Sequence, residues 1–551
     1  MDNHDIIKRF EHLWSERKGS VESVWDLIER FVVPLRGDFY STLSSEHEVD
    51  WHRRDVYDST AVYAAQTLAA SMHGNLTSPS KRWFELRFRD KALNADDAAK
   101  EWLDDCTDRI YNALAEANFD IEIAEAYLDM VTYGTSCLTE ELDGDRLNFS
   151  AVPVREIYFE EDHRKRVHRF YRKLQMTPVQ MQSQFGDKIP DCVKDKLDNP
   201  ASSTETMDVI FCIYPRPEAK DIDTGKPVHP LKRPFGYKYL LKTSAELLGE
   251  ESGYYEMPAF VSRWDKVAGS RWGKSPSTTA LADILTLNQV KEATLEAAAK
   301  AIDPANLVEE TALIGDLNLD RGSLTVVTDI NGIRPYESGT KFDVSNMEIG
   351  MLTQAIRDYF HLNQLELKES PAMTATEVNV RYELMQRHLG STFARLKSDL
   401  LNPLVQRAFR IMLREGMLIE MPPEVQGADL DVEYSGPLAR AQQVDQAIAI
   451  QNFLMSTAQI AEVYPEAIDL VDTDKAVRAM ALLQGVPAEA MRGEKEIKKM
   501  RGEREQQAQQ QQAIMQGQAQ AETLKSAGQG MAAMGQADPA MIKALGQAVG
   551  Q

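Results

Sequence analysis

Apolar residues recur at every third or fourth position from residue 2 to about residue 140, a spacing that predicts amphipathic helices. One strand interrupts this pattern. In WFELRFR, Phe84, Leu86 and Phe88 alternate with polar residues, which is the period of a half-buried strand. The clearest predicted helices are SVWDLIERFVV (residues 23–33), STAVYAAQTLAASMHG (59–74) and AAKEWLDDCTDRIYNALAEANF (98–119).

From residue 138 to residue 258 the period shortens, and Gly, Pro and Asp separate short apolar runs, which predicts a β-rich lobe. A short helix is expected inside this lobe, because Thr177 suits a cap, Pro178 a first helical position and Gly186 a helix end. The predicted strands are RLNFSAVPV (146–154), EIYFEE (156–161), RVHRFYRKL (166–174), MDVIFCIYP (207–215) and FGYKYLLKT (235–243).

The middle of the chain predicts two helices separated by a β-rich excursion. The first helix covers residues 276–302 and ends before Asp303-Pro304. Short strands follow until about residue 345, and the second helix covers roughly residues 346–367. A break at Ser370-Pro371 precedes the next helical segment.

The segment after this break predicts a long helix. Thr374 and Glu377 form a T-x-x-E capping box, and the apolar pattern continues through Pro403 to Arg414 with a kink. Two or three further helices are expected up to Leu483. The last 51 residues contain 13 Gln and 11 Ala, which leaves little with which to build a core.

Acidic residues outnumber basic residues by 85 to 62, so the formal net charge is -23. This charge favours solubility and opposes tight binding of nucleic acid, but it is compatible with a protein through which DNA slides. The hydrophobic fraction of 43% is that of a folded protein. No apolar run has the length of a membrane span, and the N-terminus lacks the apolar core of a signal peptide, so we expect neither.

The sequence gives no pattern for catalysis or metal binding. The four cysteines are far apart and form no C-x-x-C pair, and neither G-x-S-x-G nor H-E-x-x-H occurs. We therefore expect a protein that is not an enzyme and has no cofactor or metal.

The stretch GSRWGKSP, residues 269–276, nearly spells a phosphate-binding loop. That motif requires G-x-x-x-x-G-K-[ST], whereas Gly269 and Gly273 are separated by three residues. Pro276 also removes a backbone donor just where the loop needs one. We interpret Ser275 as the N-cap and Pro276 as the first residue of an ordinary helix.

Four segments in order resemble the portal, or head-to-tail connector, proteins of T7-like short-tailed bacteriophages. The resemblance extends from about Ile6 to Pro487. The segments are LAASMHGNLTSPSKRWFELRFRD (68–90), GKSPSTTALADILTLNQ (273–289), SPAMTATEVNVRYE (370–383) and YSGPLARAQ (434–442).

The resemblance implies an α+β, predominantly helical portal fold that assembles into a ring. Its parts would be a wing (1–269), a first stem helix (270–302), a clip (303–345), a second stem helix (346–367), a tunnel loop (368–373), a long helix with the return to the wing (374–436), a crown (437–485) and a Gln/Ala-rich barrel or disordered tail (486–551).

The resemblance also implies a function. A ring of about twelve copies at one capsid vertex would let double-stranded DNA pass during packaging and ejection. Its partners would be the large terminase subunit, then tail adaptor and nozzle proteins, with major capsid and scaffolding proteins around it. The protein would be part of the virion and would be assembled in the host cytoplasm.

Two sets of site residues follow from the resemblance. The expected tunnel-loop set is Glu366, Lys368, Glu369, Ser370 and Met373. Lys368 could contact a DNA phosphate or simply neutralise a helix C-terminus. The expected clip set, for docking of motor and adaptor, is Asn306, Glu309, Glu310, Asp316, Asp320, Arg321, Asn331 and Arg334.

Two other interpretations stay open at this point. A helical scaffolding or adaptor protein could assemble through its Gln/Ala tail without enclosing DNA, in which case no hollow ring would form. An ATP-driven motor subunit would bind nucleotide and lose it in a Lys274→Ala variant.

Overall fold

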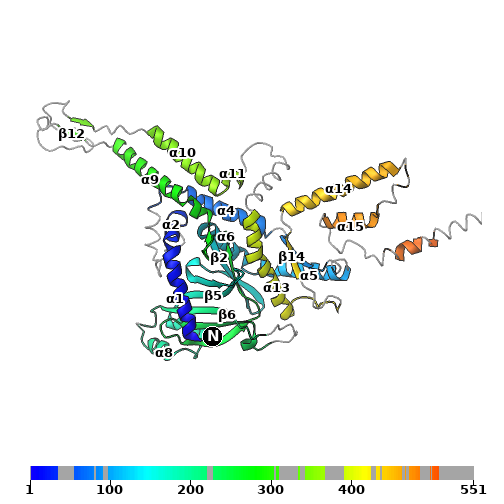
Figure 1. Cartoon of the computed structure of the whole chain (residues 1–551), viewed down its shortest axis with the longest axis horizontal. Helices are drawn as coiled ribbons and strands as arrows, with labels where there is room; N and C mark the ends of the chain where they lie inside the picture. The colour runs from blue at the N-terminus through cyan, green and yellow to red at the C-terminus, as the bar shows by residue number, and fades with distance from the viewer. Residues whose placement is uncertain are drawn as a thin grey trace, which may run out of the picture.

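A computed structural model gives the fold of the chain (Figure 1). Among the residues that the structure describes, helices dominate, and three antiparallel sheets of two, three and five strands lie among them, with two further short strand pairs. The structure describes residues 2–34, 55–79, 82–90, 93, 97–200, 202–219, 228–302, 306–308, 333–335, 342–365, 390–423, 430–434, 437–461, 464, 466, 471–483, 497, 499–504 and 506–507.

The N-terminal helices enclose the central core. Helix α6 is buried on several sides, with Ile123, Tyr127 and Met130 fully enclosed, as expected for a helix that is apolar around much of its circumference. The three helices predicted at residues 23–33, 59–74 and 98–119 are confirmed. The helices are α1 (Asn3–Ser20), α2 (Glu22–Val32), α4 (Thr60–Leu76), α5 (Asp97–Glu116) and α6 (Phe119–Tyr133).

The helical prediction for residues 135–140 is wrong. Helix α6 ends at Gly134, whose φ of +78° is a left-handed conformation that favours glycine, and strand β2 (Thr135–Asp143) starts at the next residue. A side chain at Gly134 would also collide with the backbone of Gly273, because an added Cβ would lie 2.6 Å from the Gly273 carbonyl oxygen.

The β-rich lobe predicted for the segment after α6 is confirmed. A five-stranded sheet has the order β4-β5-β6-β7-β8, and a three-stranded sheet has the order β3-β2-β9. Strands β8 and β9 and helix α8 were not predicted. The remaining elements of the lobe are β3 (Arg146–Ala151), η2 (Val154–Glu156), β4 (Ile157–Glu161), β5 (Val167–Met176), α7 (Pro178–Phe185), α8 (Asp191–Leu197), β6 (Met207–Pro215), η3 (Pro230–Lys232), β7 (Phe235–Leu241), β8 (Leu247–Tyr254), β9 (Ala259–Arg263), β10 (Asp265–Lys266) and β11 (Gly273–Lys274).

The five-stranded sheet is buried on both faces. In β6, Ile210 and Cys212 pack in the cluster that contains α1, whereas Phe211 and Ile213 belong to the central core. Successive side chains of a strand point to opposite faces, so a strand covered on both sides is apolar at every position. This arrangement explains the unbroken run VIFCIY in the sequence.

Side chains occupy the outer edges of two sheets. The Asn118 amide pairs with the edge of β3 as a strand would, donating to the Phe149 carbonyl at 2.7 Å and accepting from the Phe149 N–H at 2.8 Å. Glu122 accepts from the Ala151 N–H at 2.6 Å. On β1 (Phe84–Phe88) the Tyr111 hydroxyl accepts from the Phe84 N–H at 2.7 Å.

The predicted strand at residues 83–89 is confirmed as β1, which pairs antiparallel with β14 (Leu430–Tyr434). The remaining described elements belong to the second half of the chain. They are α9 (Pro276–Ile302), β12 (Asn306–Val308), β13 (Ile333–Pro335), α10 (Phe342–Tyr359), α11 (Leu362–Leu365), η5 (Lys397–Leu401), α13 (Asn402–Arg414), α14 (Pro437–Ala461) and α15 (Thr473–Leu483).

The long helix predicted to end at Arg414 is helical over its described part, residues 390–414. A π-helical turn, η5, ends two residues before Pro403, which lacks the N–H that an α-helix would use at that position. The capping box at Thr374 and Glu377 and the break at Ser370-Pro371 lie outside the described residues.

Helix α13 is held against β2 by a buried charged cluster. The Arg407 guanidinium donates to the Glu140 carbonyl oxygen at 3.3 Å and to the Glu256 carbonyl oxygen at 2.9 Å. Arg414 binds the Glu256 carboxylate with two hydrogen bonds. The Glu140 carboxylate is fully buried, and within the described part of the chain neither of its oxygens has a hydrogen-bond partner.

Burial raises the pKa of Glu140 to about 8, although Arg407, 3.7 Å away, lowers it in part. The unfolded chain releases this proton near pH 4.5, so the stability due to protonated Glu140 is present below pH 4.5 and is lost as the pH rises through 8. A Glu140→Gln variant keeps a neutral side chain at every pH. We expect its free energy of unfolding to match wild type at pH 4.5 and to exceed it by about 2 kcal/mol or more at pH 8.

Guanidinium titrations at pH 4.5, 6 and 8 measure this difference. Glu101→Gln, at an exposed position of α5, is the matched control and should change stability equally at all three values. A constant offset for Glu140→Gln across this range would show that Glu140 is ionised in the folded protein.

Candidate channel-forming helix pair

Helices α9 and α10 pack side by side and project from the body of the protein, with β12 beyond their far ends (Figure 1). Burial is confined to the part of α9 nearest the body. Ala280, Ile284 and Leu287 are buried there, whereas Leu295 and Ile302 are exposed. The pair therefore has a root packed into the central core and a half that stands clear of it.

The root of α9 meets the end of α6. The Ser275 hydroxyl donates to the Thr132 carbonyl at 2.6 Å, and the Ser277 hydroxyl donates to the Val131 carbonyl at 2.9 Å. The last carbonyls of a helix have no partner within it, so these hydroxyls satisfy groups that would otherwise be buried without hydrogen bonds. The positive end of one helix dipole thus faces the negative end of the other.

This junction settles the interpretation of residues 269–276. Ser275 Oγ accepts from the Thr278 N–H at 2.9 Å, which confirms Ser275 as the N-cap of a helix that starts at Pro276. Lys274 pairs with Asp265 in the short β10–β11 hairpin, and Trp272 is buried between Trp25 and Phe159. The Ser275 and Ser277 hydroxyls at the start of α9 are thus engaged with carbonyl groups of α6.

A second attachment lies three turns along α9. Asn288 Oδ1 accepts from the backbone N–H groups of Tyr57 at 2.8 Å and Asp58 at 3.3 Å, and its Nδ2 donates to the Asp55 carbonyl at 2.9 Å. Lys291 Nζ lies 2.6 Å from Asp58 Oδ2. Burial alone would raise the pKa of Asp58, but hydrogen bonds from Lys291 and Thr60 outweigh it and lower that pKa.

Helix α10 returns along α9 to the body. Ile356 and Phe360 are fully buried, and Leu362 of α11 is buried as well. A continuous helix would place residues 360 and 362 on different sides, at 100° per residue. His361 instead has a φ of +58°, which breaks the helix and lets both neighbours enter the core.

Neither metal ligation nor a membrane span is visible in what the structure describes. Among the described residues no three or more His, Cys, Asp and Glu side chains are grouped so as to hold a metal ion. Over the same ranges no helix combines the length and the apolar character needed to cross a membrane.

Comparison with known families assigns the chain. Residues 3–491 match the family model described as "Bacteriophage head to tail connecting protein". The chain belongs to this connecting-protein family. It is also 28% identical over 497 residues to the "Probable portal protein" of Bordetella phage BPP-1, covering 88% of each chain. The "Portal protein" of Salmonella phage epsilon15 is 28% identical over 564 residues, covering 99% of this chain and 98% of the relative.

The predicted membership of the head-to-tail connector, or portal, family is therefore confirmed. The connecting protein is mostly helical with some sheet, as expected for the α+β fold class. The first projecting helix has the predicted bounds, 276–302. The second was predicted at 346–367, but it starts at Phe342, since residues 340–345 contain no Gly or Pro, and it ends at Tyr359 because of the turn at His361.

Only part of the predicted sites of this connecting protein falls on described residues. Asn306 and Arg334 lie in β12 and β13, which pair so that Asn306 is opposite Pro335 and Leu307 is opposite Arg334. The other predicted clip residues lie outside the described residues, namely Glu309, Glu310, Asp316, Asp320, Arg321 and Asn331. The whole tunnel-loop set also lies outside them, namely Glu366, Lys368, Glu369, Ser370 and Met373.

The sequence prediction missed Asn288 and its partners. One signal was present, because Asn288 interrupts the apolar side of α9 formed by Ala280, Ile284 and Leu287. A buried amide on such a side requires hydrogen-bond partners. Its partners are 230 or more residues away along the chain, so the sequence could indicate that a contact exists but could not identify the partner.

An Asn288→Ala variant tests the attachment. Two backbone N–H groups and one carbonyl lose their partner, so we expect a loss of stability of about 2 kcal/mol or more and faster hydrogen exchange at the Tyr57 and Asp58 amides. Hydrogen exchange read by mass spectrometry on the peptide around residue 57 gives the measurement. Gln289→Ala, at the next and exposed position, is the control; equal exchange in the two variants would remove Asn288 from this role.

Proposed function

We propose that this connecting protein forms a ring of about twelve copies at one vertex of a phage capsid, and that the α9–α10 pairs line a channel for double-stranded DNA. The observation that supports this most is the projecting pair, anchored at its root and uncovered along its outer half. Two relatives over nearly the whole chain are named portal proteins.

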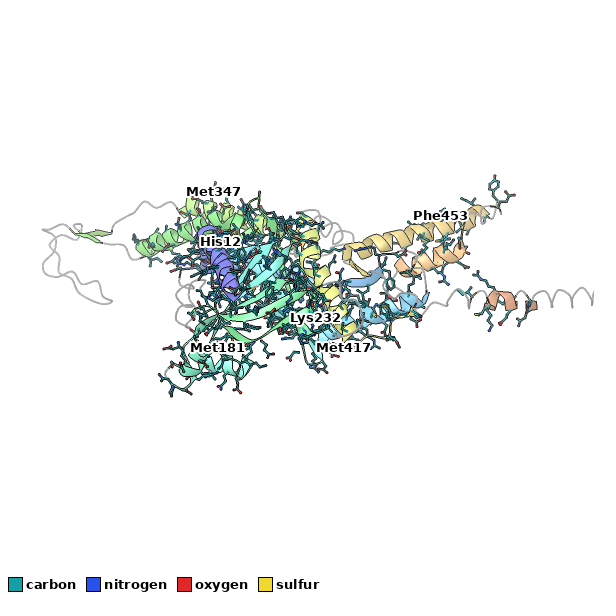
Figure 2. The ribbon with its side chains drawn as sticks, turned by 60° about the horizontal axis from the view of Figure 1, so that its bottom comes forward. His12, Met181, Lys232, Met347, Met417 and Phe453 are labelled. Atoms are coloured by element: carbon teal, nitrogen blue, oxygen red, sulfur yellow. The ribbon has the colours of Figure 1, made fainter. Side chains whose placement is uncertain are left out.

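The apolar side chains on the outer half of the pair suit contact between neighbouring copies. Leu295 and Ile302 on α9 and Met347 and Met351 on α10 are all exposed, and Figure 2 shows Met347 at the surface of this arm. In a ring, each pair has a neighbour on either side, and a head-to-tail contact that closes needs a different surface on each side. Such contacts would cover these residues.

The net charge suits a channel that lets DNA slide. A ring of about twelve chains at -23 each carries a formal charge of about -280. Each cation that neutralises a phosphate adds attraction, so a channel wall with few cations would let the duplex slide without binding it tightly.

We assign the outer β12–β13 region to docking of the large terminase subunit during filling and of tail adaptor or nozzle proteins afterwards. It lies beyond the far ends of α9 and α10, on the side away from the body of the protein (Figure 1). Capsid and scaffolding proteins would surround the body. The mature protein would reside in the virion after assembly in the host cytoplasm.

Removal of residues 368–373, which precede the long helix, tests the channel. We expect both the full chain and the purified variant to form hollow rings in end-on negative-stain images. Packaging or retention of DNA by the variant should fall at least about ten-fold, because the channel loses its expected constriction. Packaged DNA is measured in phage assembled with the variant. Deletion of residues 546–551, equally long, is the control.

Two results would contradict the proposal. A compact monomer of the full chain at high concentration would remove the ring. Rings of the deletion variant that package and retain DNA normally would remove the tunnel assignment while leaving the ring in place.

A further inference from the structure

Helix α14 carries large apolar side chains that are exposed to solvent. Phe453 lies on this helix, away from the sheets (Figure 2), and 58% of it is exposed. Ile448, Met455 and Ile460 of the same helix are exposed as well. Single exposed apolar residues are common, but several on one helix indicate a contact surface.

These side chains lie on two different flanks of α14. The least exposed positions include Ala447, Ile450 and Leu454, which form the side packed on α15. At 100° per residue, Ile448 and Met455 lie on one flank of that side, and Phe453 and Ile460 lie on the other, roughly 140° away. We call them the 448 flank (Ile448, Met455) and the 453 flank (Phe453, Ile460).

The same part of α14 has no charge. Residues 446–461 contain no Asp, Glu, Lys or Arg, in a chain of which 27% is charged. Covering this surface therefore does not require any charged side chain to lose its water. The partner surface, in turn, needs no opposite charge to pair with one on α14. A second α14 meets that condition, since it is equally uncharged.

We propose that α14 packs between the α14 helices of two neighbouring copies, with the 448 flank of one copy against the 453 flank of the next. Two different surfaces on one chain are what a head-to-tail contact requires, whereas a two-fold contact would use one surface twice. The proposal rests on the ring proposed above and names a surface that holds it. One helix flank is smaller than the roughly 800 Å² per partner of a stable interface, so α14 acts together with other contacts between the same copies.

Cysteine cross-linking of the full chain tests the pairing. In a Cys192→Ser background, which removes the exposed natural cysteine, each residue of the 448 flank is paired with each of the 453 flank in four double-cysteine variants. After oxidation, at least one double variant should give a ladder of covalent oligomers on a non-reducing gel. The single variants, and Ser456→Cys on the outward side, should stay monomeric on the same gel.

Other results would overturn the inference. Hollow rings in the microscope without a ladder in any double variant would reject it and leave the ring intact, whereas absence of rings from the unmodified chain would reject the proposed function itself. Dimers from a single-cysteine variant would indicate a two-fold contact. Maleimide labelling of Phe453→Cys that rises at least ten-fold when residues 508–551 are deleted, with rings preserved, would show that the chain's own tail covers α14.

Discussion

The structure depends on a buried junction at which the end of α6 meets the start of α9. Ser275 and Ser277 hydrogen-bond to the Thr132 and Val131 carbonyls, and the Trp25 indole N–H donates to the Tyr133 carbonyl at 3.1 Å. These are carbonyls that a helix cannot satisfy by itself. If α9 shifted by one turn, the Thr132 and Val131 carbonyls would be buried without partners, so the position of α9 is fixed by hydrogen bonding as well as by packing.

Two glycines make this junction geometrically feasible. Gly134 and Gly273 bring their backbones so close that a Cβ on either residue would overlap the other chain segment. The left-handed turn at Gly134 then sends the chain directly into β2, so the same residue ends α6 and starts a sheet. A helix of 27 residues, about 40 Å long, is in this way aimed by a small contact at one end and by Asn288 farther along.

Local signals in the sequence were enough to predict an element where capping residues, Pro or Gly mark both of its ends. Ser275-Pro276 and Asp303-Pro304 bracket α9, and Thr177-Pro178 with Gly186 bracket α7, so both were predicted with their bounds. Strand β2 was missed although Gly134 lies directly before it, because the helical pattern was extended past this single glycine to about residue 140. The positive φ of His361 and the pairing of Arg407 with Glu140 arise from tertiary contacts, and no local pattern encodes them. The expected channel residues came from family resemblance and stay predictions.

The side chains that close the edges of β1 and β3 have a consequence for the proposed ring, in which the protein would stand among many copies of itself. An unpaired sheet edge among closely spaced copies can hydrogen-bond to a strand of another copy, and the sheet can then extend by further pairing. Because Asn118, Glu122 and Tyr111 already hydrogen-bond to backbone groups of those edges, the edges cannot pair with a strand of a neighbouring copy at these positions. In the proposed ring, any contact at these two edges would then run through side chains, which can shift past one another without breaking a ladder of main-chain hydrogen bonds.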